Sequence, residues 1–235
     1  MSEDAYQRSG EVHSAADLEL VYEDDELVAI NKPAWSVVHY TRGVRGALLL
    51  NNALAERTGA KVFPLHRLDR QTSGVIVFAK SSEVASLMSA DVRDGIWHKR
   101  YLGLARGTIE APLTCDRGVK EGDVRRDARS DFEPLESFCD RYTLVRATPH
   151  TGRRHQLRYH LKHISHPIVG DVLYGDSKVN RFFRETFGLG RHFLHAAWLR
   201  VLRPGRAEAL ELEAPLPPEL EDVLEKLRAY DGPVV

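Results

Sequence analysis

The segment that most constrains this chain is a charged loop that leads directly into an apolar run. Residues 66–74 read His-Arg-Leu-Asp-Arg-Gln-Thr-Ser-Gly, and residues 75–79 are continuously apolar. An apolar run of this length after turn-forming residues is typical of a buried strand. We therefore expect the carboxylate of Asp69 at a loop-to-strand junction between two arginines. Neighbouring cations favour an ionised carboxylate, the form that covalent or general-base chemistry requires.

Short pieces of this segment also have ordinary explanations. An Asp beside arginines is usually a simple ion pair, and Thr-Ser-Gly is usually a turn. The pattern His-Arg-x-Asp is similar to the protein-kinase catalytic loop, but Leu68 interrupts the contiguous His-Arg-Asp of that loop. No Gly-rich phosphate loop precedes the segment, so the kinase interpretation is disfavoured.

Hydrophobic periodicity predicts strands and helices that are interspersed without βαβ regularity. This arrangement favours an α+β fold with a mixed sheet. The segment 114–140 is polar and rich in Asp and Arg, and its weak periodicity predicts a mobile loop leading into a short strand. The expected strands are 18–22, 27–31, 75–79, 97–105, 142–147, 193–202 and 209–213, and the expected helices are 46–57, 81–93, 151–163, 181–187 and 219–230.

Length and composition are ordinary for a soluble globular protein. The chain has 235 residues, of which 43% are hydrophobic and 29% charged. It contains no apolar stretch long enough to span a membrane. The polar, acidic start does not resemble a signal peptide, so we expect an acidic tail over 1–17 followed by a single catalytic domain over 18–235. Cys115 and Cys139 are far apart and form no Cys-x-x-Cys pair, which fits a reducing cytoplasm.

The charge is distributed unevenly along the chain. The net charge is −1, yet residues 141–206 hold 13 Lys or Arg and three acidic residues, whereas residues 1–30 hold nine acidic residues and one base. A basic middle between acidic ends can attract phosphate groups even when the overall charge is near zero. A basic surface can also serve solubility alone. Seven histidines in the same region favour RNA as the partner.

Four segments in order resemble the RluA family of pseudouridine synthases. Residues 66–74 match the pattern H-R-L-D-x-x-T-S-G, and residues 20–33 resemble the opening hairpin that ends in Asn-Lys-Pro. Lys99-Arg100-Tyr101 resembles the K-x-Y motif. Residues 151–158 and 166–171 resemble T-G-R-x-H-Q-I/L-R followed by H-P-I-x-G-D. The resemblance covers about residues 18–217, with a gap around 114–140.

Three further stretches resemble the branch of the family that modifies tRNA. They are residues 174–181, 187–191 and 194–196. The resemblance implies a uridine in the T stem of tRNA as the target, with a ribosomal RNA as the alternative. It also implies a mixed, largely antiparallel sheet split by a catalytic cleft with flanking helices. Because the first hairpin follows so soon after residue 1, we expect no separate S4 RNA-binding domain.

The resemblance implies a reaction in which uracil is detached from C1′, rotated and rejoined through C5, without redox change and without a cofactor. Asp69 is the expected essential residue, whether it attacks C6 or C1′ or acts as a base at C2′. Arg158 is implied to pair with this Asp, and Tyr101 to stack on the uracil near C5. Arg67 is implied to contact the RNA at the flipped base. Leu157 and Leu194 are expected to form an apolar floor, and the remaining candidate RNA contacts are Lys32, Arg70 and Arg154.

Two other functions compete with this interpretation. A catalytically silent RNA-binding module would keep the basic region, but it need not keep Asp69, Tyr101 and Arg158 together. The spacing of His160, His163 and His166 suggests a metal-dependent hydrolase, yet no H-E-x-x-H is present. We therefore expect no metal, no membrane association and a monomeric enzyme.

Overall fold

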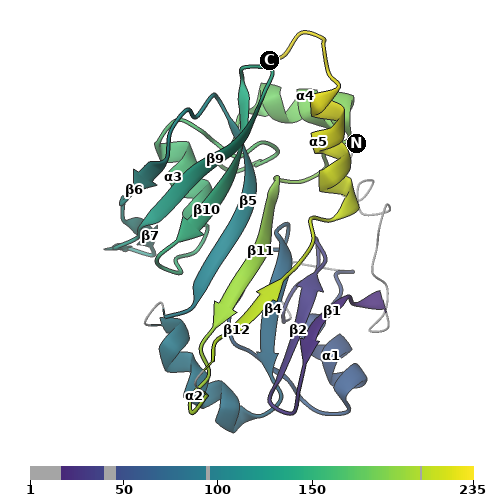
Figure 1. Cartoon of the computed structure of the whole chain (residues 1–235), viewed down its shortest axis with the longest axis vertical. Coiled ribbons are helices and arrows are strands. Elements are labelled where there is room, and N and C mark those ends of the chain that lie inside the picture. Colours follow the sequence, from purple (N-terminus) through teal and green to yellow (C-terminus); the bar gives the residue numbers. More distant parts are fainter. Residues whose placement is uncertain (1–16, 40–45, 94–95, 207) are drawn as a thin grey trace. The chain divides into compact units, whose positions relative to one another are not determined.

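The computed structural model describes residues 17–39, 46–93, 96–206 and 208–235, which form two compact units (Figure 1). The first unit extends to Trp97 and also contains Trp198–Pro215, and the second consists of His98–Ala197 and Leu216–Val235. Neither unit is a continuous stretch of sequence. The predicted acidic tail lies outside the described residues except for Asp17, and the single catalytic domain over 18–235 stays a prediction.

The first unit contains antiparallel strands and two helices. Its elements are β1 (Leu20–Glu23), β2 (Leu27–Lys32), α1 (Leu50–Thr58), β3 (Phe63–Pro64), β4 (Ser73–Ala79), α2 (Ser82–Arg93), the end of β11 (Leu194–Val201) and β12 (Leu210–Glu213). β2 pairs with β1 and with β4, in a register that sets Lys32 opposite Gly74. β12 pairs antiparallel with β11.

β4 is the centre of the first unit. All seven of its residues are buried, which agrees with the apolar run over residues 75–79. Val75 and Val77 pack in one core with Met88 of α2 and Leu199 of β11. Burying a side chain of this size stabilises a fold by roughly 1.5–3 kcal/mol, so β4 provides a rigid support for the loop before it.

Asp24 closes the turn between β1 and β2. Its carboxylate accepts hydrogen bonds from the backbone N–H groups of Glu26 and Leu27, at 2.9 and 2.8 Å, and from the Tyr22 hydroxyl at 2.7 Å. Arg203 adds an ion pair at 2.5 Å. Burial raises the pKa of Asp24, but these hydrogen bonds outweigh burial and lower the pKa to about 2.

The second unit contains a row of antiparallel strands and three helices. Its elements are β5 (His98–Arg106), β6 (Leu113–Cys115), β7 (Val119–Glu121), β8 (Val124–Arg126), β9 (Ser130–Phe138), β10 (Tyr142–Pro149), α3 (Gln156–His163), α4 (Ser177–Phe187), the start of β11 and α5 (Pro218–Arg228). β5, β10, β9 and β6 are neighbours in that order, and β7 and β8 form a separate hairpin.

The two faces of this row of strands carry separate cores. Leu104 of β5 and Tyr142 of β10 pack with α4 and α5, which lie together in Figure 1. The next residue on β5, Ala105, belongs to the other core with Val145 and the α3 leucines, Leu157 and Leu161. Successive residues of a strand point to opposite faces, so β5 and β10 contribute to both cores. The predicted α+β class with largely antiparallel pairing is confirmed.

Two predicted elements are wrong. The segment 114–140 is not a mobile loop, because it contains the end of β6 and all of β7, β8 and β9, and β9 pairs along its length with β10. Its strand pattern is hidden because the buried positions include polar Ser130 and because Pro134 lies in the strand near a register shift. The helix predicted over 151–163 begins only at Gln156, since His155 has a left-handed backbone with φ of 55°.

Candidate active site

Asp69 lies in the turn that leads into β4. The Thr72 N–H donates to the Asp69 carbonyl oxygen at 3.0 Å, which closes the turn. The neighbouring Leu68 is buried and Arg67 is exposed, while Asp69 is half-buried. The motif therefore anchors the turn through its leucine and its strand, and it leaves the carboxylate of Asp69 near the surface of the first unit.

Lys32 fixes the same turn from the end of β2. Its side chain is fully buried, and its Nζ donates to the carbonyl oxygens of Pro33, Arg70 and Thr72 at 3.0, 3.2 and 2.9 Å. Two of these oxygens, those of Arg70 and Thr72, belong to the turn that begins at Asp69. This environment favours a positioning role for Lys32 over the predicted phosphate contact.

Arg70 packs on the loop after β2. Its guanidinium lies 5.1 Å from the centre of the Trp35 ring, and its Nε donates to the Trp35 carbonyl oxygen at 3.4 Å. The Trp35 N–H donates in turn to the Arg70 carbonyl oxygen at 2.7 Å. Lys32, Asp69 and Arg70 thus meet in the first unit, and a phosphate contact by Arg70 or an RNA contact by Arg67 stays a prediction.

Arg158 is held by a buried carboxylate in the second unit. Its Nε donates to Oδ2 of Asp171 at 2.6 Å and its Nη2 donates to Oδ1 at 2.9 Å. Asp171 is fully buried and also accepts the N–H groups of Leu173 and Tyr174 at 2.9 and 3.0 Å. Burial raises the pKa of Asp171, but the hydrogen bond and charge of Arg158 outweigh burial, so the pKa lies below its ordinary value.

The loop that presents Asp171 depends on a glycine and an asparagine. Gly170 has a φ of 81°, and a Cβ there would lie 2.1 Å from the Arg191 carbonyl oxygen. Asn180 of α4 accepts the Gly170 N–H and donates to the Asp171 carbonyl oxygen, both at 2.8 Å. No role was predicted for Asp171 from the sequence. Its position in the H-P-I-x-G-D motif, close in sequence to the motif that carries Arg158, was the available signal.

Gln156 holds the loop before α3. Its side-chain oxygen accepts from the Thr151 hydroxyl at 2.7 Å and from the Arg153 N–H at 3.0 Å. Its Nε2 donates to the Arg129 carbonyl oxygen and to Ser130 Oγ, both at 2.9 Å. The Thr-Gly-Arg-x-His-Gln motif is therefore a loop closed by its own glutamine, and α3 begins where that loop ends.

Tyr101 is associated with the core of the predicted floor residues. It packs against the core that contains Leu157 and Leu194, which are 6% and 4% exposed. Gly103, on the same face of β5, lies next to Leu194, since a Cβ there would be in ordinary van der Waals contact with Leu194 Cδ1 at 3.5 Å. Arg154, which precedes Leu157 in the sequence, is exposed. Its backbone N–H donates to Glu121 Oε1 at 3.4 Å.

The candidate residues therefore form one group in each unit. Asp69, Lys32, Arg67 and Arg70 belong to the first unit, and Tyr101, Arg154, Leu157, Arg158 and Leu194 belong to the second. The pairing of Asp69 with Arg158 joins residues of both units, and it stays a prediction.

The histidines of α3 have structural contacts. His160 is buried, with Nε2 donating to the Arg117 carbonyl oxygen at 2.8 Å and Nδ1 within 3.0 Å of Ser130 Oγ. Both ring nitrogens of His160 are thus engaged. In the described ranges no three His, Cys, Asp or Glu side chains gather as metal ligands would. No described helix combines the length and apolar character needed to cross a membrane.

Comparisons with known proteins agree with the motifs. The family model for RNA pseudouridylate synthase matches residues 26–163. tRNA pseudouridine synthase C of Haemophilus influenzae is 36% identical over 88% of this chain and 96% of its own length. Ribosomal large subunit pseudouridine synthase C of Vibrio cholerae is 36% identical over 94% of this chain and 73% of its own length. The structure of human RNA pseudouridylate synthase domain containing 1 superposes with a TM-score of 0.74 at 25% identity, over 95% of this chain and 99% of that one.

Proposed function

Because this chain belongs to the RNA pseudouridylate synthase family, we propose that it converts a specific uridine of tRNA, in the T stem, into pseudouridine. The observation that carries the proposal is its similarity, over most of its length, to relatives named tRNA pseudouridine synthase C. The predicted family and branch are confirmed by these relatives. The chain is an RNA pseudouridine synthase, an isomerase that acts within one molecule.

Asp69 is the proposed essential group. A carboxylate can attack C6 of uracil or C1′ of ribose, or it can remove a proton at C2′, and each route ends with uracil rejoined through C5. What supports a reactive role is the position of Asp69 in a turn fixed by buried neighbours, with its own side chain half-buried. A positioned carboxylate loses little orientational freedom when the nucleotide arrives.

Arg158 and Tyr101 are the proposed partners of Asp69. Arg158 would orient the Asp69 carboxylate, and its fork is already aligned by Asp171. Tyr101 would stack on the target uracil above the apolar surface of Leu157 and Leu194. Because these side chains would exclude water, every charge interaction with the base would be stronger.

The target uridine must leave its helix to reach such a site. Extruding a nucleotide costs a few kcal/mol, so contacts that replace the lost stacking are needed. Arg67, which is exposed beside Asp69, is the proposed replacement, and the exposed Arg154 is a proposed contact to the RNA backbone. We further propose that the enzyme is a cytoplasmic monomer in which residues 18–235 act as one catalytic domain, and that it needs no cofactor.

Ribosomal RNA is the second candidate substrate. The similarity to ribosomal large subunit pseudouridine synthase C favours it, because that alignment covers 94% of this chain. The chain spans only 73% of that relative, whereas it spans 96% of the Haemophilus tRNA enzyme. The tRNA substrate is therefore preferred.

Tritium release distinguishes these possibilities. Uridine labelled with tritium at C5 loses its label to water when C5 forms the new glycosidic bond. We expect release from transcribed tRNA, little release from a large-subunit rRNA transcript, and a loss of at least about 10³-fold for Asp69→Ala. Asp25→Ala, which removes an exposed acid from the first hairpin, should retain full activity. Full activity of a folded Asp69→Ala variant would exclude the assigned role.

A further inference from the structure

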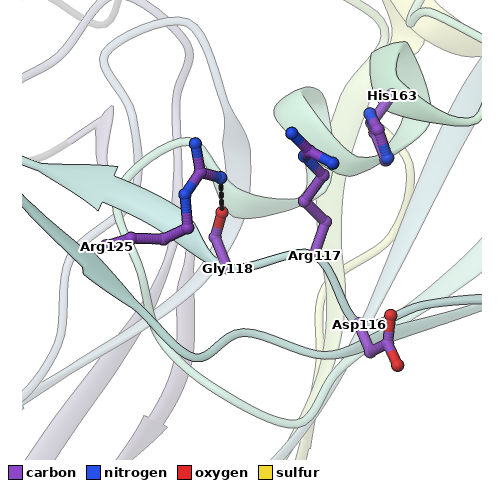
Figure 2. A pocket seen from close by; sticks show the side chains of 5 residues that line it. All are labelled: Asp116, Arg117, Gly118, Arg125 and His163. Atoms are coloured by element: carbon purple, nitrogen blue, oxygen red, sulfur yellow. Dashed lines mark hydrogen bonds between the residues drawn. The ribbon is translucent and has the colours of Figure 1, made fainter.

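An open pocket of about 380 Å³ lies beside the β7–β8 hairpin, entirely within the second unit (Figure 2). Its volume is in the range of sites that hold small ligands. None of the predicted catalytic residues lines it. The lining residues are Asp116, Arg117, Gly118, Arg125 and His163.

Two exposed arginines give the pocket its charge. Arg117 Nε donates to the Tyr159 hydroxyl oxygen at 3.4 Å, and Arg125 Nη1 donates to the Gly118 carbonyl oxygen at 2.6 Å. Across the described ranges, neither guanidinium forms an ion pair with a carboxylate. Arg146 and Arg228 of the same unit differ, since each pairs with a glutamate. The two cationic groups therefore lie close together without a protein counterion.

Tyr159 joins these arginines to α3. Hydrogen bonds from Arg125 and Arg117 lower the pKa of its hydroxyl, so both guanidinium groups face the same oxygen. The Tyr159 ring stacks on His163, with a centroid distance of 6.3 Å and an interplanar angle of 10°. His163 therefore lines the pocket as one ring of a stacked pair, and Arg117 and Arg125 line it with N–H donors.

A buried hydrogen-bond chain holds Arg117 in place. His160 Nε2 donates to the Arg117 carbonyl oxygen, so Nδ1 of the neutral ring accepts from Ser130 Oγ. Ser130 Oγ accepts in turn from Gln156 Nε2 at 2.9 Å. Burial lowers the pKa of His160, which agrees with the neutral ring. This series of hydrogen bonds connects the pocket to the loop that precedes α3. Because it already fixes the backbone of Arg117, a ligand loses less binding energy in ordering the pocket.

Gly118 is required for the position of Arg125. A Cβ at this residue would lie 2.8 Å from Arg125 Cγ and 2.9 Å from the Arg126 carbonyl oxygen. Any other residue would displace the Arg125 side chain or the hairpin backbone. In the view of Figure 2 the carboxylate of Asp116 is directed away from the two guanidinium groups.

We propose that this pocket binds a backbone phosphate of the RNA substrate, at a nucleotide other than the target uridine. A guanidinium group can bind a phosphate through two parallel hydrogen bonds. A phosphate would also supply the counterion that the protein lacks here. The phosphate contact would fix the RNA against α3, the helix that also carries Arg158. The inference rests on the proposed function for the identity of the RNA.

The test compares two double variants that each remove two positive charges from the second unit. Arg117→Ala/Arg125→Ala should raise the KM for tRNA about tenfold at physiological salt and lower the slope of log Kd against log salt by about one, with kcat within about twofold. Arg146→Ala/Arg228→Ala is the matched control, because both arginines are balanced by glutamates. The control should keep the salt slope of the unmodified protein.

Two further variants separate geometry from charge. Arg117→Lys/Arg125→Lys keeps the charge and should recover the salt slope but only part of the affinity, since lysine lacks the fork. Gly118→Ala keeps both arginines and should raise KM several-fold because it displaces Arg125. Thermal unfolding checks that each variant is folded, and wild-type KM in both Gly118→Ala and the double alanine variant would overturn the inference.

The outcomes also separate this inference from the proposed function. If the unmodified chain forms pseudouridine and the double alanine variant matches the control, the pocket does not bind RNA. If the chain forms no pseudouridine in either RNA, the proposed function fails, and the salt slopes alone decide whether the pocket contacts RNA. Titration with inorganic phosphate tests the other source of the same chemistry. Phosphate binding that is lost in the double alanine variant while RNA affinity is unchanged would overturn the RNA assignment.

Discussion

In the first unit a buried ammonium group fixes the turn that carries Asp69, whereas in the second unit a buried carboxylate fixes the guanidinium of Arg158. Lys32 donates to three neutral carbonyl oxygens, and Asp171 receives two hydrogen bonds from a full positive charge. Removing Lys32 would leave carbonyl groups without that donor, but removing the Asp171 charge would leave a buried guanidinium without its counterion. The two units should therefore respond differently to loss of the positioning group.

The largest effect is expected from Asp171→Asn. This change keeps the shape of the side chain but removes the charge that balances Arg158, and breaking a buried ion pair typically costs about 3–5 kcal/mol. Urea unfolding should show this loss, and kcat should fall because Arg158 is no longer aligned. Glu133→Gln removes the carboxylate partner of the partly exposed Arg146 and should cost less than about 1 kcal/mol. Equal costs for the two variants would contradict the comparison.

Lys32→Met should have an intermediate effect. The variant keeps the aliphatic stem and removes the Nζ donor, so about 2 kcal/mol of the free energy of unfolding should be lost. Activity should fall with it, because the Asp69 turn loses its fixed geometry. Lys80→Met is the matched control from the end of β4, where the ammonium forms a more exposed pair with Glu23. If Lys32→Met lowers the free energy of unfolding as much as Asp171→Asn does, the charge of the hydrogen-bond partner does not decide how much stability is lost.

The smallest effect concerns Asp24, a partly exposed carboxylate of the first unit. Its pKa of about 2 in the folded protein lies below the ordinary 3.8. Its stabilisation is therefore complete above about pH 3.8 and is lost as the pH falls through about 2, so at neutral pH Asp24→Asn should cost about 1–2 kcal/mol. Urea unfolding from about pH 6 down to about pH 2 measures the difference in free energy of unfolding between the unmodified protein and Asp24→Asn. This difference should become smaller as the pH falls. The exposed Asp25→Asn should show no such trend, and a constant Asp24→Asn difference would contradict the assignment.

Local patterns predicted the elements whose burial follows their own sequence. β4 is apolar at nearly every position and is buried throughout, and the β1–β2 hairpin has a turn of three acidic residues between its two strands. Only a short strand was predicted where β9 extends over nine residues, because its buried face includes Ser130, whose hydroxyl is satisfied by His160 and Gln156 from α3. From the sequence alone a polar residue is predicted to be exposed, because hydrogen-bond partners from distant segments are not known.

The start of α3 was missed for a related reason. Residues 151–155 contain no proline and one glycine, so the pattern alone allows a helix from Thr151. The side chain of Gln156 instead closes a loop with Thr151 and Arg153 and reaches the backbone of Arg129. These contacts satisfy the polar groups of the loop more fully than an isolated helical turn would.

The amino-acid sequence by itself pointed to Asp69 as the candidate carboxylate and determined the family and most of the local elements, because these depend on residue identity and on periodicity along the chain. Only the tertiary structure decided that Lys32 is buried under a turn 40 residues away, that Asp171 rather than solvent balances Arg158, and that Arg117 and Arg125 share a pocket. The physical reason is that the energy of a charge depends on its burial and on its partners, and both are set by segments that meet only when the chain has folded.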